Sequence, residues 1–227
     1  NGEIINLTNS GYSSGSPSFA LDGNAILFTT ERYGMRAHAS WGSLDDAMLV
    51  FLNQDAYDKF SLSKEDYELY KEANSDRKKV AAKDSSKVKD VVVELKNIED
   101  RIVRLTPNSS NMGSTLISKD GKTLYYLAST ESGRNLWKMD LNKKETKLLH
   151  KVDAGWTSLE MDKEGKTLFI LNGKNMQKMN MASNDLKPIK YLAQVKLDLA
   201  AEREYMFDHV YKQQQKRVYN TKSEAKR

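Results

Sequence analysis

The chain has 227 residues, of which 39% are hydrophobic and 30% are charged, and it contains no cysteine. These values predict a globular protein and exclude disulfide bonds, thiol catalysis and cysteine-bound zinc. The net charge of +5 comes from basic residues gathered in residues 77–89 and 212–227, without the interleaved aromatic side chains of a nucleic-acid groove, so we expect no nucleic-acid partner.

The first predicted element is a short strand at Ile4–Thr8. Its sequence matches that of Ile102–Thr106, 98 positions later, and the same offset relates residues 16–28 to residues 114–126. Residues 158–170 repeat the unit a third time, 44 positions further on. Each copy has the pattern of a strand, a turn made of an acidic residue and glycine, and a second strand.

A repeat of this length predicts a β-propeller, because units of about 40–45 residues with several short strands are typical of propeller blades. We therefore predict a mainly β protein: a partial β-propeller of about three four-stranded, WD40-like blades, with a helical insertion and a C-terminal helix. An ordinary antiparallel meander with common Asp-Gly hairpins is the alternative. In the propeller interpretation, Ile4–Thr8 is the outer strand of a blade whose first three strands are absent.

The first blade carries an insertion, because its 98 positions exceed the 44 of the regular repeat. We place the insertion at about residues 36–89. The third strand of the blade is then predicted at Asp90–Leu95 and the fourth at Arg101–Thr106. Residues 47–52, inside the insertion, have the apolar pattern of an extra strand.

A helix is predicted over residues 64–74 of the insertion, because Ser63-Lys-Glu-Asp66 resembles a capping box. Insertions in repeat proteins map to loops on one face, which is often the binding face. The insertion is therefore a candidate contact surface. A packing cap or a spacer is the alternative.

The second and third blades are regular. An Asp120-Gly121 turn and a Glu164-Gly165 turn join the first two strands of each blade. The predicted strands of the second blade are residues 114–118, 124–128, 136–141 and 146–150. The last two strands predicted for the third blade are residues 176–181 and 186–191.

A helix is predicted at residues 198–219, which contain strong helix formers and neither Gly nor Pro. We place a boundary between a partial propeller at residues 1–191 and a helical linker or following domain at residues 192–227. No stretch approaches the ~18 apolar residues of a transmembrane helix, so we expect no membrane span. Propellers close with four to eight blades, so we expect either a piece of a longer protein or half of a ring completed by a second copy.

No motif in the sequence predicts a catalytic, cofactor-binding or metal-binding residue. A nucleophilic serine needs an elbow and an oriented base, whereas Ser13–Ser16 reads as a loop that leads into a strand. Asp22, Asp120 and Glu164 occupy turns one blade apart and do not form a carboxylate pair. The three histidines, which are separated along the chain, are His38, His150 and His209.

Four stretches of the chain resemble tricorn-type serine peptidases, in particular their bacterial homologues. The second and fourth of these stretches are the more specific, whereas the first is shared with TolB-type propellers generally. The stretches are Ser16–Arg32, Ala47–Phe60, Glu99–Pro107 and Tyr205–Arg217.

The resemblance implies that the chain contains the last blades of the second propeller and the first helix of the core domain of such a hydrolase. The catalytic serine and histidine of the family lie beyond that helix, so no residue of this chain matches them. The resemblance also implies partners: peptides or protein segments gated or guided towards a catalytic domain absent from this chain, and the other domains of the parent peptidase. It favours a periplasmic over a cytoplasmic location for a soluble protein.

A second hypothesis belongs to a different class. The chain is then a stand-alone protein-interaction module, completed as a ring by homodimerisation or by strand exchange through Ile4–Thr8, because unpaired strand edges favour such pairing. Catalysis by the purified chain is expected under neither hypothesis, and no cofactor is required by either.

Overall fold

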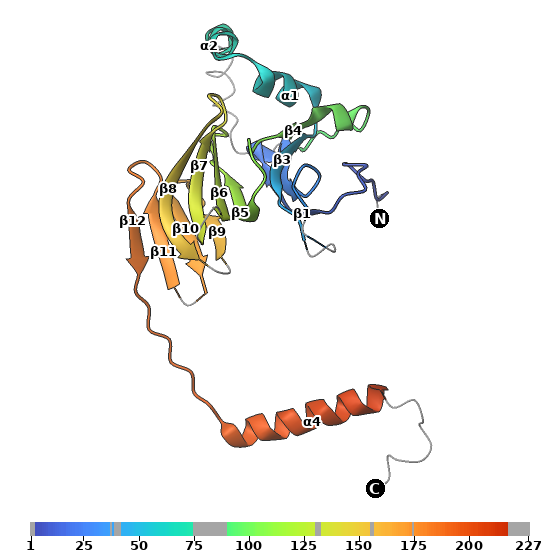
Figure 1. The fold of residues 1–227 in the computed structure, drawn as a ribbon, viewed down its shortest axis with the longest axis vertical. Helices are drawn as coiled ribbons and strands as arrows, with labels where there is room; N and C mark the ends of the chain where they lie inside the picture. The colour runs from blue at the N-terminus through green and yellow to red at the C-terminus, as the bar shows by residue number, and fades with distance from the viewer. Residues whose placement is uncertain are drawn as a thin grey trace. The chain divides into compact units, whose positions relative to one another are not determined.

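The computed structural model describes residues 3–36, 38, 42–74, 90–129, 133–154, 157–173 and 175–217. The chain divides into two compact units, Asn1–Ile189 and Lys190–Arg227. In the described part of the first unit, twelve strands form three four-stranded antiparallel sheets, and strands adjacent in the sequence are neighbours in each sheet. The three sheets stack side by side in chain order (Figure 1), and we call them blades 1, 2 and 3.

Blades 2 and 3 confirm the repeat. Gly121 and Gly165 in the turns between their first and second strands have φ angles of 71° and 74°, which glycine adopts without a steric penalty. Blade 2 consists of β5 Asn111–Ile117, β6 Thr123–Ser129, β7 Arg134–Asp140 and β8 Glu145–Ala154. Blade 3 consists of β9 Thr157–Met161, β10 Thr167–Asn172, β11 Asn175–Asn180 and β12 Leu186–Ile189.

Blade 1 differs from the prediction in its third strand. Its elements are β1 Ser14–Ala20, the 3-10 turn η1 Leu21–Gly23, β2 Ala25–Thr30, β3 Asp46–Phe51 and β4 Ile102–Arg104. The segment predicted as an extra strand at residues 47–52 is therefore the third strand, and the prediction of that strand at Asp90–Leu95 is wrong.

Burial explains why β3 takes the third position. All six residues of β3 are buried, and the strand pairs with β2 along its whole length and with β4 on its other side. Val91, Val92 and Val93 are 48–59% exposed and belong to no strand. A strand between two others needs apolar side chains on both faces, and β3 supplies them. Most of the insertion therefore lies between β3 and β4.

The predicted strand at Ile4–Thr8 is not formed. These residues join no sheet, and Ile4 is 99% exposed. A strand needs a neighbouring strand to satisfy its backbone groups, and the described residues provide none here. Leu7 instead packs against the face of blade 1 that points away from blade 2.

The core lies between the blades. One apolar cluster joins blade 1 to blade 2 and contains Leu49 and Leu124, both fully buried. A second cluster joins blade 2 to blade 3 and contains Leu127 and Leu168, also fully buried. Blade 2, the middle sheet, therefore presents alternate residues to its two neighbours, as expected for stacked sheets.

The face of blade 1 that points away from blade 2 is covered by the chain itself. Phe28, Met48 and Val50 are at most 6% exposed. Leu7 packs on this cluster, and Ile98, at the start of the 3-10 turn η4 Ile98–Arg101, belongs to it. We call this surface the front face of blade 1.

The insertion contains two helices. Helix α2, Lys64–Ala73, begins at the predicted capping box, with Ser63 Oγ accepting from the Asp66 N–H. Helix α1, Gln54–Ser61, was not predicted, although Asn53 caps it by accepting from the Ala56 N–H.

The second unit contains helix α4, Leu199–Arg217, which confirms the predicted helix over the described residues. Asp198 Oδ1 accepts from the N–H groups of Ala200 and Ala201 and begins the helix. The last residues of the predicted helix and the tail to Arg227 lie outside the described residues. Among the described residues, no helix is long and apolar enough to cross a membrane.

Candidate functional site

The first strands of the three blades meet at a groove. Strands β1, β5 and β9 together line a cavity of about 760 Å³. We call these strands the inner strands. The apolar lining of the groove includes Phe19, Leu27, Met112, Leu116, Ile117, Leu159 and Met161. The polar lining of the groove is Ser16, Ser18, Ser114, Thr115, Thr157, Glu160 and Arg134.

Irregular pairing in two inner strands shapes the groove. The register of β1 against β2 shifts between Gly15 and Ser18, and that of β5 against β6 shifts between Met112 and Thr115. These two bulges are repeat equivalents. A bulge bends a strand and redirects its side chains, so hydroxyl and apolar side chains from neighbouring blades face one cavity.

The inner strands do not present a continuous free edge. Pro17 has no N–H to donate. The Leu159 N–H of β9 already donates to Ser114 Oγ of β5, at 3.1 Å, which links blades 2 and 3. A ligand that lies across the three strands can therefore be held by side chains more readily than by a long backbone ladder.

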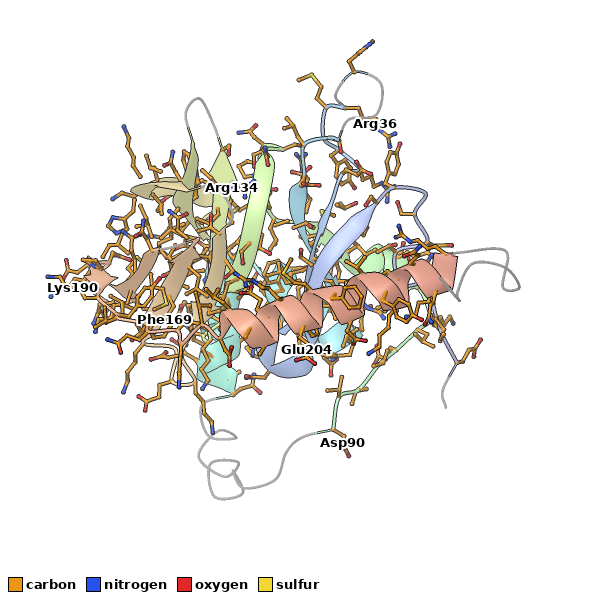
Figure 2. The ribbon with its side chains drawn as sticks, turned by 90° about the horizontal axis from the view of Figure 1, so that it is seen from below. Arg36, Asp90, Arg134, Phe169, Lys190 and Glu204 are labelled. Carbon is orange, nitrogen blue, oxygen red and sulfur yellow. The ribbon has the colours of Figure 1, made fainter. Side chains whose placement is uncertain are left out.

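Arg134 forms one end of the groove. Its Nη2 donates to Asn111 Oδ1 at 3.0 Å, and its side chain lies flat against Gly113. A Cβ on Gly113 would come within 3.1 Å of Arg134 Cδ and 3.3 Å of Nη1. Figure 2 shows Arg36 and Arg134 towards the same end of the propeller unit, opposite the segment that starts at Asp90.

The two repeat-equivalent glycines are expected to respond differently to alanine. A Cβ on Gly15 would meet only Thr29 Oγ1, at 3.9 Å, so Gly15→Ala should raise the free energy of unfolding by about 0.5 kcal/mol through the entropy of the unfolded chain. Gly113→Ala should give no gain or a loss of about 1 kcal/mol, because Arg134 must move. Urea unfolding followed by circular dichroism measures both. Equal effects of the two substitutions would contradict the close contact between Gly113 and the Arg134 side chain.

A smaller hollow of about 210 Å³ lies between the turns of blades 1 and 2 and the insertion helices. The rings of Tyr57 and Phe60 in α1 pack on Phe51, with ring centroids 5.7 and 5.0 Å away. Helix α1 therefore serves as a packing cap over these turns. Charged side chains of opposite sign surround the hollow, among them Asp22, Lys59, Lys119, Asp120 and Lys122.

A carboxylate network lies at the start of β3. Asp46 is fully buried and accepts from Arg104 Nε at 3.1 Å and Nη2 at 2.9 Å, from Thr106 Oγ1 at 2.8 Å and from Ser109 Oγ at 2.7 Å. Burial raises the pKa of the neighbouring Asp45 carboxyl, and the carboxylates of Glu31 and Asp46 raise it further. Both carboxylate oxygens of Asp46 accept hydrogen bonds from β4 and the segment that follows it, which indicates a structural role.

The histidines lie in three different environments. His38 is exposed in the loop between β2 and β3. His150 lies in β8, with its Nε2 2.7 Å from the Asn184 carbonyl oxygen. His209 lies on α4, where its ring centroid is 6.1 Å from that of Tyr205. In the described part of the chain, no group of three or more metal-ligating side chains is close enough to hold an ion.

The predicted turn residues lie where expected. Asp120 Oδ1 accepts from Ser118 Oγ at 2.6 Å and from the Lys122 N–H at 3.1 Å, so this carboxylate supports the turn that it occupies. Asp22, in η1, has a φ angle of 55°. The sequence predicts these turns, whereas no motif in it indicates the groove, because the two bulges that shape the groove are visible only in the strand registers of the structure.

Comparisons with known proteins identify the architecture. No protein-family model matches the chain, and no curated protein matches it. A solved structure of the tricorn protease superposes on it with a TM-score of 0.60 at 10% sequence identity, covering 94% of this chain and 21% of the tricorn protease.

The fold is that of a partial β-propeller. Two further propellers were found with lower scores. TolB from Acinetobacter baumannii gives a TM-score of 0.48 at 13% identity over 82% of this chain and 34% of TolB. The propeller domain of the Trilobed protease from Pyrococcus furiosus gives 0.43 at 12% identity over 80% and 43%. The chain spans less than half the length of each.

Proposed function

We propose that this propeller segment binds peptides or extended protein segments in the groove along β1, β5 and β9 and has no catalytic residues of its own. In this proposal it belongs to a larger, tricorn-like serine peptidase and guides substrates towards a catalytic domain that lies outside this chain. The other domains of that peptidase are its remaining partners.

The observation that carries the proposal is the groove itself. A cavity of about 760 Å³ is within the range of ligand sites. Its methionine and leucine side chains can accept varied side chains, since methionine adapts its shape readily. The hydroxyl groups of Ser18 and Thr115 can hydrogen-bond a peptide backbone. This mixture suits loose recognition of many peptides, which a guiding role requires.

The structural likeness supports the fold component of the proposal. The described strands align with a stretch of the tricorn protease over most of this chain. The link to peptidase function comes from the sequence resemblance at Ala47–Phe60 and Tyr205–Arg217. In this structure these two stretches form β3 with α1, and the greater part of α4.

Binding of unstructured peptides tests the proposal. Fluorescein-labelled peptides from a casein digest should bind the full chain, with a rise in fluorescence anisotropy and without cleavage. Ser18→Trp places an indole in the groove at an exposed position and should weaken binding about tenfold or more, because it occupies the volume that the ligand needs. Lys147→Trp, at an exposed position of the outer strand β8, is the matched control and should bind as the parent does.

Two results would contradict the proposal. Equal binding by the Ser18→Trp and Lys147→Trp variants would show that the peptide lies elsewhere. Peptide hydrolysis by the purified chain, abolished by a serine-directed inhibitor, would show that a catalytic site exists within it.

One feature of the structure argues against an interaction module completed as a ring by a second copy, and another argues for it. Ring closure by a second copy requires the front face of blade 1, which Leu7 and Ile98 already cover. The face of blade 3 that points away from blade 2, however, has no neighbouring blade among the described residues. A protein-interaction role is therefore a second candidate function, with blade 3 as its contact surface.

A further inference from the structure

The outward face of blade 3 carries an apolar row. Leu171 pairs with Met176, and Met176 pairs with Ile189, so these three side chains share one face of the sheet. Leu171 is 37% exposed, and Met176 and Ile189 are half-buried. The opposite face contains Leu168, Ile170 and Met179, which are fully buried against blade 2. We call the outward surface the back face of blade 3.

A second row on the back face is charged at both ends. Glu160 pairs with Phe169, Phe169 with Lys178, and Lys178 with Lys187. The order across the sheet is therefore an acidic residue on the inner strand, an aromatic ring, and two lysines towards the outer strand. Glu160, Lys178 and Lys187 are all exposed. Phe169 is labelled in Figure 2.

The repeat shows that this type of face is normally covered. Phe169 and Leu171 are the repeat equivalents, 44 positions on, of Tyr125 and Leu127 in blade 2. Tyr125 is 2% exposed and Leu127 is fully buried, both against blade 3. The back face of blade 3 thus has the composition of a buried interface, although the described residues of the propeller unit place no blade on it.

A second copy of the chain offers two surfaces that could cover it. The front face of blade 1 is occupied by Leu7 and Ile98, so head-to-tail stacking would first have to displace them. The back face of blade 3 is complementary to itself. Rotation by 180° about an axis parallel to the strands, in the plane between two such sheets, places each inner strand over the partner's outer strand.

We propose that two copies of the chain associate through their back faces of blade 3 in a two-fold symmetric dimer. The rotation brings Glu160 opposite Lys187 of the partner subunit. It also stacks Phe169 on the aliphatic stem of Lys178 of the partner subunit, and it sets Leu171 against Met176 of the partner subunit. Opposite charges therefore meet at both rims, Leu171 and Met176 form the apolar centre, and Ile189 lies opposite Ser158 of the partner subunit.

Charge reversal tests the pairing directly. The mass of the full chain in solution, measured by light scattering over a concentration series, should change from monomer to dimer. Glu160→Lys and Lys187→Glu should each weaken dimerisation about tenfold or more, since like charges then face each other at both rims. The double variant should restore it, because the two charges have exchanged places. Glu145→Lys, at an exposed position on β8, is the control and should dimerise as the parent does.

The proposal is overturned if the parent chain is monomeric at all concentrations, or if the double variant is no better than either single one. The first outcome would leave the face to a partner of another kind. Glu160 also lines the groove, so Lys187→Glu, which lies outside the groove, is the single variant that separates the two proposals. It should weaken dimerisation and leave peptide binding unchanged. The groove variant Ser18→Trp should dimerise normally, so failure of one proposal is distinguishable from failure of the other.

Discussion

Asp46→Ala is expected to lower the free energy of unfolding by about 3 kcal/mol or more, because a buried, paired carboxylate is removed while its partners stay. The side chain is fully buried. Arg104 loses two hydrogen bonds, and the buried Thr106 hydroxyl loses its acceptor. The residual positive charge of Arg104 then lies at the edge of an apolar sheet. Urea unfolding followed by circular dichroism measures the change.

Two further variants separate the charge from the packing around Asp46. Asp46→Asn preserves the shape and can still accept, so it should cost less than alanine. The double variant Asp46→Leu with Arg104→Met removes both partners and should recover part of the loss, as found for buried pairs replaced by apolar residues. A loss below about 0.5 kcal/mol for Asp46→Ala, typical of an exposed position, would contradict the structural role of this network.

Arg101→Ala is expected to release the segment that covers the front face of blade 1. Arg101 is 3% exposed. Its guanidinium donates to the carbonyl oxygens of Phe51 at 3.3 Å and Lys96 at 3.1 Å, and also to that of Glu94. Buried carbonyl groups left without a donor cost about 1–3 kcal/mol each, so a loss of about 3 kcal/mol in the free energy of unfolding is expected.

Hydrogen exchange locates the effect of Arg101→Ala. Amide protection should fall first in the described segment 90–101 and then in β3, because Ile98 leaves the apolar cluster of Phe28 and Met48. Arg101→Lys should not restore protection, since one ammonium group cannot reach carbonyls that a planar guanidinium spans. Unchanged exchange in segment 90–101 would contradict the anchoring role of Arg101.

The strands of blades 2 and 3 were predictable because their signals are local. An acidic residue followed by Gly121 or Gly165 marks each hairpin turn, and the flanking apolar runs pair with their nearest neighbours in the sequence. The capping box at Ser63 predicted α2 for the same reason. In each case a few consecutive residues contain the physical cause of the element.

The misplaced elements depend on partners that lie far away in the sequence. Residues 90–95 include three consecutive valines and therefore have the composition of a strand. The position beside β2 is nevertheless taken by β3, because its apolar side chains are buried on both faces of the sheet. Ile4–Thr8 resembles an outer strand but has no described neighbour to pair with. Helix α1 is stabilised by its contact with Phe51, which a reading of local pattern does not detect.

The groove could not be predicted from the sequence for a related reason. Most of its lining comes from β1, β5 and β9, with Leu27 from β2 and Arg134 from β7. No motif joins those positions in the sequence. The sequence by itself determined the repeat, the turns and the propeller class, since spacing and turn chemistry repeat with each blade. Only the tertiary structure decided which segment completes blade 1, which faces are covered and where the groove lies. Those outcomes follow from competition for burial between distant segments, and the better-packed segment takes the space.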